Sequence, residues 1–234
     1  MWLAVVVSWL VSSTTAHAYF VNYAAREINF KIVYVGTPTV GTAAVDNVRY
    51  IYDKTEADSR GQLLDLAPGG GERQLVFDFS PQTLGEMRGF RFRFHLYTAP
   101  TTKAAGDLFA LTMKGFDGIV FIADAAPAHA KANLAALADL KRRLSADGIA
   151  YEKASIVFEL VGTDRPGAVA VADLAKALDI GNRPMFEADL AKGVGVFDTL
   201  KAIAKALLVH IRDTDIDQID KYAKSPSATP AVKP

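Results

Sequence analysis

Apolar positions along the chain follow two spacings in turn, which predicts strands interleaved with helices. Apolar runs typical of strands covered on both faces occur in GIVFIADA and ASIVFELVG, and INFKIVYVG is predicted as a strand that runs into a glycine loop. Apolar residues at helical spacing occur in TAAVDNVRYIYDKT, KANLAALADLKRRLSADG, VADLAKALDIGN and FDTLKAIAKALLVHI. Strands that alternate with helices form a mostly parallel sheet with helices on both faces. The pattern therefore predicts an α/β fold whose ligands bind at the carboxyl ends of the strands.

Residues 73–80 and 90–99 form a pair of predicted strands with no clear helix between them. Without a crossover helix, we expect one strand at the edge of the sheet to run antiparallel. The second segment alternates, with phenylalanines on one face and Arg91, Arg93 and His95 on the other. We expect this polar face to be solvated, as on an edge strand.

Both ends of the chain differ from the segment between them. Residues 1–19 contain an apolar run with no Lys or Arg before Arg26, and small residues flank His17. Three interpretations stay open: a start assigned too far upstream, a cleaved signal peptide, or a short apolar extension. Residues 216–234 are rich in Pro, Ser and Ala, which predicts a disordered tail. The predicted domain therefore spans residues 20–215.

Composition narrows the function classes. The chain has 234 residues, which suffices for one α/β domain, and its 26 basic and 26 acidic residues cancel. Zero net charge and the lack of a basic run argue against a nucleic-acid partner. The absence of cysteine excludes thiolate nucleophiles and thiolate metal sites. The apolar run is too short to cross a membrane, so we expect a cytoplasmic protein without an integral span, or an exported one if the signal is real.

The loop after the first apolar strand has the glycine spacing of a phosphate-binding loop. Such a loop reads G-x-x-x-x-G-K-[ST], and Gly36 and Gly41 fit its two glycines. The next two positions hold Thr42 and Ala43 in place of Lys and Ser or Thr. The sequence therefore keeps the shape of the motif without its charged residue.

Longer segments carry a family resemblance. NYAAREINFKIVYVG, YIYDKT, ERQLVFDFSPQTLGEMRGFRFRFHLYT, KGFDGIVFIADA and GVGVFDTLKAIAK are similar to the bacterial Ras-like GTPases of the MglA type, from about Phe20 to about Ile211. Proteins of this family set cell polarity in gliding and twitching bacteria. The resemblance implies a Ras-like P-loop G domain, with a mostly parallel central sheet covered by helices on both faces.

Several site positions depart from that family. The first switch keeps Glu72 and Arg73 but has Gln74 in place of Thr. The second switch reads TAPTT at 98–102, without the family's Gly and Gln, and VGTD at 161–164 retains only the Asp of the guanine motif. The residues that the resemblance assigns to a degenerate nucleotide pocket are Gly36, Gly41, Thr42, Ala43, Arg73, Thr101, Thr102 and Asp164.

These departures favour a pseudo-GTPase. Charged hydrogen bonds contribute about 1.5–3 kcal/mol each, so losing the Lys contacts and Mg²⁺ ligands removes roughly 6–8 kcal/mol of binding. We therefore expect no enzyme activity, no metal site and no cofactor, and a role as a protein-interaction module in polarity or motility. The resemblance implies an MglB-like roadblock dimer, an MglA-like paralogue or a polar scaffold as the partner.

An alternative stays open beside this hypothesis. The chain can be an atypical small GTPase that binds GTP or GDP with Mg²⁺ through compensating residues, namely Thr42, Lys103 or Lys192. The resemblance would make Arg73 a catalytic arginine in cis. Alternatively, Arg73 forms a surface ion pair with an acidic neighbour such as Glu72 or Asp78.

Overall fold

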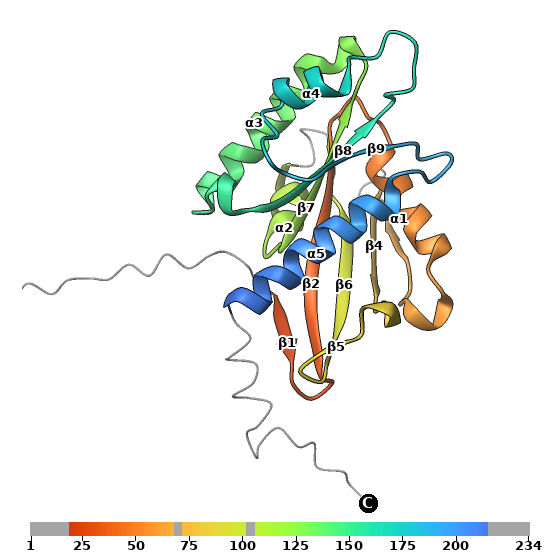
Figure 1. Ribbon diagram of the computed structural model, residues 1–234, viewed down its shortest axis with the longest axis vertical. Helices are drawn as coiled ribbons and strands as arrows, with labels where there is room; N and C mark the ends of the chain where they lie inside the picture. The colour runs from red at the N-terminus through yellow and green to blue at the C-terminus, as the bar shows by residue number, and fades with distance from the viewer. Residues whose placement is uncertain (1–18, 68–71, 102–105, 215–234) are drawn as a thin grey trace, which may run out of the picture.

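The computed structural model describes residues 19–67, 72–101 and 106–214 (Figure 1). The residues that precede, follow or interrupt these ranges include the segments 1–18 and 215–234, and also Thr102 and Lys103. The expectations about the signal-like segment, the disordered tail and these two residues therefore fall outside the described residues.

One mixed sheet forms the centre of the described chain. Its strands run in the order β3 (Leu64–Leu66), β4 (Gln74–Phe79), β6 (Phe90–Thr98), β2 (Glu27–Gly36), β7 (Gly118–Asp124), β8 (Ser155–Val161) and β9 (Met185–Ala188). Two short strands, β1 (Phe20–Asn22) and β5 (Glu86–Met87), pair with β2 and β6. The sheet is parallel from β6 to β9. The predicted α/β fold with a mostly parallel sheet is therefore confirmed.

The antiparallel part of the sheet corrects one expectation. Strand β4 runs antiparallel to both β6 and β3, so β6 lies inside the sheet between β4 and β2. Its polar face is not simply solvated. Arg93 forms ion pairs with Glu27 and Asp78, and His95 Nε2 lies 2.9 Å from Asn29 Oδ1. Burial lowers the pKa of His95, so the neutral ring is favoured here.

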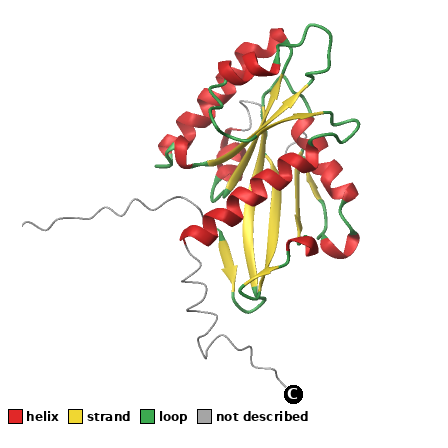
Figure 2. Cartoon of the chain, in the orientation of Figure 1, coloured by secondary structure: helices red, strands yellow, loops and turns green. Residues whose placement is uncertain are grey.

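Helices cover both faces of the sheet (Figure 2). On one face lie α1 (Ala43–Lys54) and α5 (Val196–Thr214), whose apolar residues share a cluster with alternate residues of β2 and β6. On the other face lie α2 (Gly106–Met113), α3 (Ala130–Ala146) and α4 (Val171–Ala177). Short 3₁₀ turns complete the path, namely η1 (Ala57–Ser59), η3 (Gln82–Leu84), η5 (Pro127–His129) and η6 (Tyr151–Lys153).

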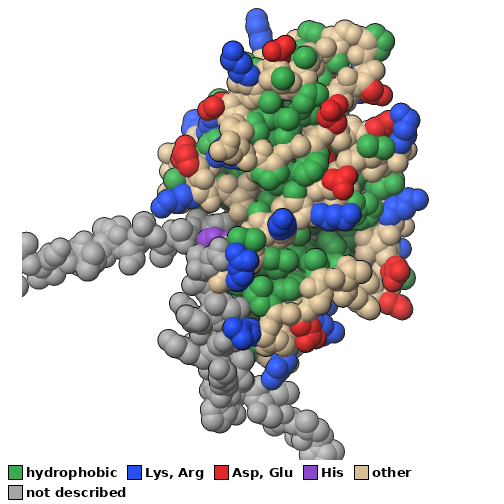
Figure 3. Space-filling view, in the orientation of Figure 1, with side chains coloured by type: hydrophobic (Ala, Val, Ile, Leu, Met, Phe, Trp, Pro, Cys, Tyr) green, Lys and Arg blue, Asp and Glu red, His purple; other side chains and the backbone are tan. Residues whose placement is uncertain are grey.

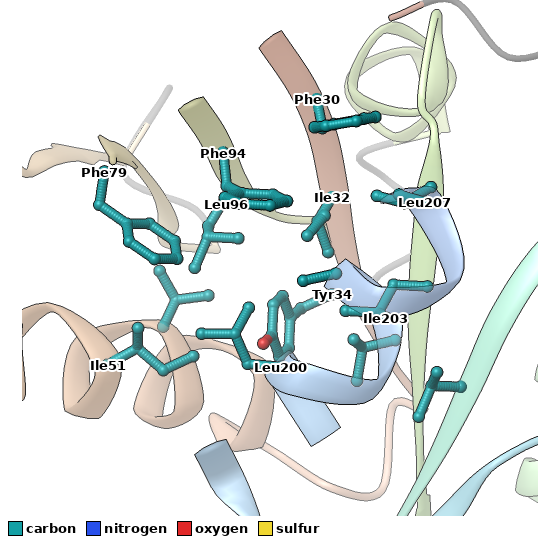
Figure 4. Packing of buried hydrophobic residues seen from close by; sticks show 14 of the residues in the cluster. Phe30, Ile32, Tyr34, Ile51, Phe79, Phe94, Leu96, Leu200, Ile203 and Leu207 are labelled. Carbon is teal, nitrogen blue, oxygen red and sulfur yellow. The ribbon is translucent and has the colours of Figure 1, made fainter. Parts of the chain in front are cut away.

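The core between the sheet and α5 is rich in aromatic rings (Figure 4). Phe30 and Phe94 stack with ring centroids 5.4 Å apart, and Phe79 lies 5.6 Å from Phe94. Leu200 and Ile203 of α5 pack in the same cluster. Burying each such side chain contributes about 1.5–3 kcal/mol, so this layer fixes α5 against the strands. Among the described residues, no helix has the length and apolar character needed to cross a membrane.

Candidate functional site

The carboxyl ends of β2, β8 and β9 meet beside a cavity of about 360 Å³. In open α/β sheets this edge is where ligands bind, and small-molecule pockets start at about 300 Å³. The lining comes from the phosphate-loop region, α1 and the loops after β7, β8 and β9: Val40, Ala43, Asp46, Asp124, Val161, Gly162, Asp164, Arg165, Ala188, Asp189, Leu190 and Ala191. The predicted site residues Ala43 and Asp164 therefore line one cavity.

The phosphate loop runs from Gly36 to the start of α1. Gly41 has φ +58°, a left-handed conformation that favours glycine. The loop folds on itself, because the backbone N–H of Val40 donates to the Thr37 carbonyl and that of Ala43 donates to the Val40 carbonyl, both at 3.1 Å. Thr42 Oγ1 donates to Asp46 Oδ2 at 2.6 Å. The Thr42 hydroxyl, one of the expected compensating groups, is therefore directed at a carboxylate of the first helical turn.

The two positions where the resemblance places Mg²⁺ ligands do not supply them in this structure. Ala43 carries only a methyl group, and Gln74 is buried on β4. The Gln74 amide donates to the Thr98 carbonyl at 3.1 Å and to Thr112 Oγ1 at 2.6 Å, so it ties β4 to β6 and α2. Within the described ranges, no group of three or more His, Asp or Glu residues could hold a metal ion. These side chains do not fit a protein-built metal site.

The remnants of the two switches contact each other. Thr101 donates to Glu72 Oε1 from its backbone N–H at 2.6 Å and from its hydroxyl at 2.7 Å. Thr101 also lies beside the phosphate loop, since a Cβ added at Gly36 would be 3.7 Å from Thr101 Cγ2. The structure therefore places Thr101 next to Gly36, and the two line a second cavity rather than the one beside Asp164. Thr102, the position of the family's Gln, lies outside the described residues.

Arg73 does not line the cavity. Its guanidinium forms an ion pair with Asp65 of β3, and Arg49 of α1 contacts the same carboxylate at 2.8 Å. Hydrogen bonds from Arg73 hold the pKa of Asp65 below its ordinary value. The expected partners Glu72 and Asp78 were wrong, because Glu72 accepts from Thr101 and Asp78 pairs with Arg93. The expectation of a surface ion pair for Arg73 is confirmed, with a different partner.

The loop after β8 carries the retained Asp164 and a neighbouring cation. Gly162 has φ +72°, and a Cβ added there would meet Arg165 Cζ at 2.9 Å and Nε at 3.0 Å. The Arg165 guanidinium therefore fills the space of a side chain at 162, where the family has Lys. Arg165 Nη1 also lies 3.4 Å from Asp124 Oδ2 at the end of β7. Sequence reasoning missed Arg165, although a cation next to Asp164 was a visible signal.

The loop after β9 holds its own lysine. Lys192 Nζ lies 2.5 Å from Asp189 Oδ2, and the backbone N–H groups of Ala191 and Lys192 donate to Asp189 Oδ1. The bond to Asp189 raises the pKa of Lys192. Lys192 was expected to compensate for the lost phosphate contact, but the structure pairs it locally with Asp189.

A buried carboxyl group lies behind the cavity. Glu159 of β8 is completely buried, and Asn47 Nδ2 of α1 donates to its Oε1 at 2.5 Å. Burial raises the pKa of Glu159, and the hydrogen bond from Asn47 opposes this rise. The pair joins the helix after the phosphate loop to the strand that ends at Val161. Sequence reasoning missed it, although a single Glu within an apolar strand was the available signal.

Comparison with curated proteins gives a relative that spans the domain. The chain is 43% identical over 193 residues to the mutual gliding-motility protein MglA of Myxococcus xanthus, and the match covers 82% of this chain and 97% of the relative. No family model matches the chain. Identity at this level over nearly the whole relative extends far beyond the site loops.

This similarity corrects two expectations from the sequence, that the chain is not an enzyme and that it needs no cofactor. Both expectations were based on a few substitutions at the site, from which a loss of nucleotide binding and hydrolysis was inferred. The match of 43% identity over nearly the whole of MglA instead indicates a functional small GTPase, which is an enzyme with a nucleotide ligand. The substitutions at the site do not by themselves show that activity is absent. The chain belongs to the MglA family of Ras-like small GTPases.

Proposed function

We propose that this chain is an atypical small GTPase that binds GTP and GDP, with Mg²⁺, through contacts that partly replace those of its family. One observation carries the proposal: the Arg165 guanidinium occupies the space above Gly162, next to the retained Asp164. Arg165 thus supplies a cation, and the adjacent Asp164 supplies the carboxylate of the family's guanine motif, at one wall of the cavity.

The wall of the cavity formed by Gly162, Asp164 and Arg165, which we call the base end, suits guanine. A guanine ring presents N–H donors along one edge, and an ionised carboxylate is an acceptor with two oxygens. Asp164 would accept these donors, and the planar guanidinium of Arg165 would lie against the face of the ring. The contact with Asp124 at 3.4 Å orients Arg165 toward the cavity. Adenine lacks the same donor pattern, so this wall favours guanine nucleotides.

The wall formed by Val40, Ala43 and Asp46, which we call the phosphate end, would hold the phosphates of a nucleotide more weakly. The N-terminal end of α1 favours an anion through its dipole, but the nearby Asp46 carboxylate opposes it. Mg²⁺ usually keeps several waters and binds substrate phosphates, and it would supply charge neutralisation there. We expect slow hydrolysis, because Thr occupies position 102, where a Gln would orient the attacking water.

We further propose that the chain acts in the cytoplasm, in cell polarity or motility. This rests on membership of the MglA family and on the gliding motility that the relative's name records. Small GTPases of this kind act through protein partners. An MglB-like roadblock dimer, an MglA-like paralogue and a polar scaffold are the candidates.

The test measures nucleotide binding by calorimetry on the full chain, with GDP and ADP in the presence of Mg²⁺. We expect GDP to bind at least about tenfold more tightly than ADP, because a bonded donor–acceptor pair contributes roughly 1–3 kcal/mol of discrimination. Asp164→Ala should remove this preference, and Arg165→Ala should weaken binding of both nucleotides. Arg142→Ala, an exposed arginine on α3, is the matched control. Equal binding of GDP and ADP, or no binding of either, would overturn the proposal.

A further inference from the structure

An apolar groove of about 510 Å³ lies between α5, the end of α1 and the turn η3. It is separate from the candidate nucleotide site. Its apolar walls come from the sheet, from η3 and from one face of α5: Phe79, Leu84, Phe94, Leu200, Ala204 and Leu208. Figure 3 shows apolar side chains gathered on this face of the molecule, with basic side chains among them. Leu84 is 41% exposed, so part of the apolar wall faces solvent.

The rim of the groove is basic. Lys54 at the end of α1 and Lys201 and Lys205 on α5 line it, and all three are exposed. Among the described lining residues the acidic side chain is Glu56. Lys201 Nζ lies 4.0 Å from Oδ1 of Asp198 on the same helix. A ligand that fits this groove therefore combines apolar side chains with negative charge.

The chain carries such a segment immediately after α5. Residues 215–222 read DIDQIDKY, with three aspartates interleaved with Ile216, Ile219 and Tyr222. Helix α5 ends at Thr214, and Leu208 lies six residues earlier, or about 9 Å along the axis. An extended chain spans about 3.3 Å per residue, so three residues return to Leu208 and five remain to follow the groove.

We propose that residues 215–222 fold back along α5 and dock in this groove. Ile219 and Tyr222 lie against the apolar wall, while Asp217 and Asp220 face Lys205 and Lys201. Exposed ion pairs are individually weak, but a short tether provides an effective concentration in the millimolar range. Even a weak contact therefore populates the docked state. The docked segment then covers the apolar surface between α5 and η3.

The N-terminal segment is the competing occupant. Residues 1–11 are apolar, and Tyr19 packs against Phe30, whose ring stacks on Phe94 in the groove wall. This segment carries no acidic residue before Glu27, so it leaves the lysine rim unpaired. Charge complementarity therefore favours the C-terminal segment.

Because the chain contains no cysteine, introduced pairs can test the docking directly. Leu84→Cys with Gln218→Cys should form an intramolecular disulfide several-fold faster than Leu111→Cys with Gln218→Cys, measured by mass spectrometry of non-reduced peptides under mild oxidation. Leu111 is 67% exposed on α2, on the opposite face of the sheet. Adding Lys201→Glu and Lys205→Glu should slow disulfide formation between Leu84→Cys and Gln218→Cys several-fold. Adding Lys131→Glu with Lys176→Glu instead should leave that rate unchanged.

A second measurement does not depend on disulfide formation. In the full chain with Leu84→Cys alone, the thiol alkylation rate should rise several-fold when Asp215, Asp217 and Asp220 are each replaced by Lys. Equal disulfide rates for the two pairs, together with an unchanged alkylation rate, would overturn the proposal. Faster crosslinking of Leu84→Cys with Ser8→Cys than with Gln218→Cys would also overturn it, because the N-terminal segment would then occupy the groove.

Discussion

The two ends of the proposed nucleotide cavity differ in how charge is arranged. At the base end, Asp164 is accompanied by Arg165, which fills the space above Gly162 and contacts Asp124. At the phosphate end, Thr42 donates to Asp46, and the motif's lysine position therefore carries a neutral hydroxyl beside a carboxylate. The base end therefore carries a cation from a neighbouring position, whereas the phosphate end carries a carboxylate in the first turn of α1.

This difference shows that a lost motif residue can be replaced only where another side chain reaches the same space. Arg165 lies three residues from Gly162, across a tight turn, so its long side chain folds back over the glycine. At the start of α1 the nearby cations have other partners, because Arg73 forms an ion pair with Asp65, and Lys192, in the loop after β9, is paired with Asp189. We therefore expect selectivity for the base and strength of phosphate binding to depend on different residues in this chain, so that each can be changed without the other.

The largest expected effect comes from restoring the cation at the phosphate end. Thr42→Lys with Ala43→Thr should tighten GDP binding by at least about 30-fold in the presence of Mg²⁺, because each charged hydrogen bond contributes about 1.5–3 kcal/mol. Preference for GDP over ADP should stay unchanged, because the base end is untouched. Calorimetry with both nucleotides measures the two quantities together.

Thr42→Ser, which keeps the hydroxyl, is the control for this change. Asp46→Asn should by itself tighten binding several-fold, since it removes a negative charge near the phosphates. If the double variant folds correctly and binds GDP no more tightly, affinity is not limited at the phosphate end and the comparison fails.

A smaller effect is expected from the buried Glu159, which connects the two ends through Asn47. Its ordinary pKa is 4.5, and burial raises the pKa in the folded protein. The folded state then binds more protons than the unfolded state, so the free energy of unfolding should fall as pH rises from about 4.5 through the folded pKa, and then level off. Glu159→Gln keeps an acceptor for Asn47 and removes this fall.

The wild-type chain and the Glu159→Gln variant should be similar in stability at pH 4, and the variant should be the more stable of the two once Glu159 is ionised. Denaturant unfolding across this pH range measures the difference. Tyr34 is also completely buried, and its pKa is raised, so it stays neutral in this range. A constant difference between the chains at all pH values would show that Glu159 does not titrate in the folded protein.

Much of the fold followed from the spacing of apolar residues, because buried strands and amphipathic helices leave a strong pattern. β7, β8, α1, α3 and α5 all appear where the sequence predicts them. Short elements were missed: β1 is three residues long and β9 four, too short to show a period. Strand β1 places Tyr19 against Phe30, so the folded region begins earlier than the predicted first strand near residue 28.

The site was harder to predict because motif positions were judged one at a time. The motif order predicted one pocket, whereas in the structure Asp164 lines one cavity and Thr101 and Gly36 line another, so the assignment of these residues to a nucleotide site stays a prediction. The role of Arg165 depends on the turn at Gly162, where φ is +72°, and this geometry is invisible in a motif comparison. The hydrogen bond between Asn47 and Glu159 joins residues 112 positions apart, so no local pattern could reveal it.

The smallest effect is expected at Arg73, which the family resemblance would make catalytic. In the structure Arg73 pairs with Asp65, 54% of its side chain is exposed, and it does not line the cavity. Exposed ion pairs contribute little to stability, so Arg73→Gln should leave the thermal midpoint and the affinity for GDP unchanged. The rate of GTP hydrolysis, measured as phosphate release in single turnover, should also stay the same, with Arg49→Gln as the control that loses the same partner.

A drop of tenfold or more in the hydrolysis rate of the Arg73 variant alone would show that Arg73 leaves Asp65 and reaches the nucleotide during hydrolysis. The phosphate end would then gain its cation from the residue that precedes β4, and the difference between the two ends would hold only for the nucleotide-free protein.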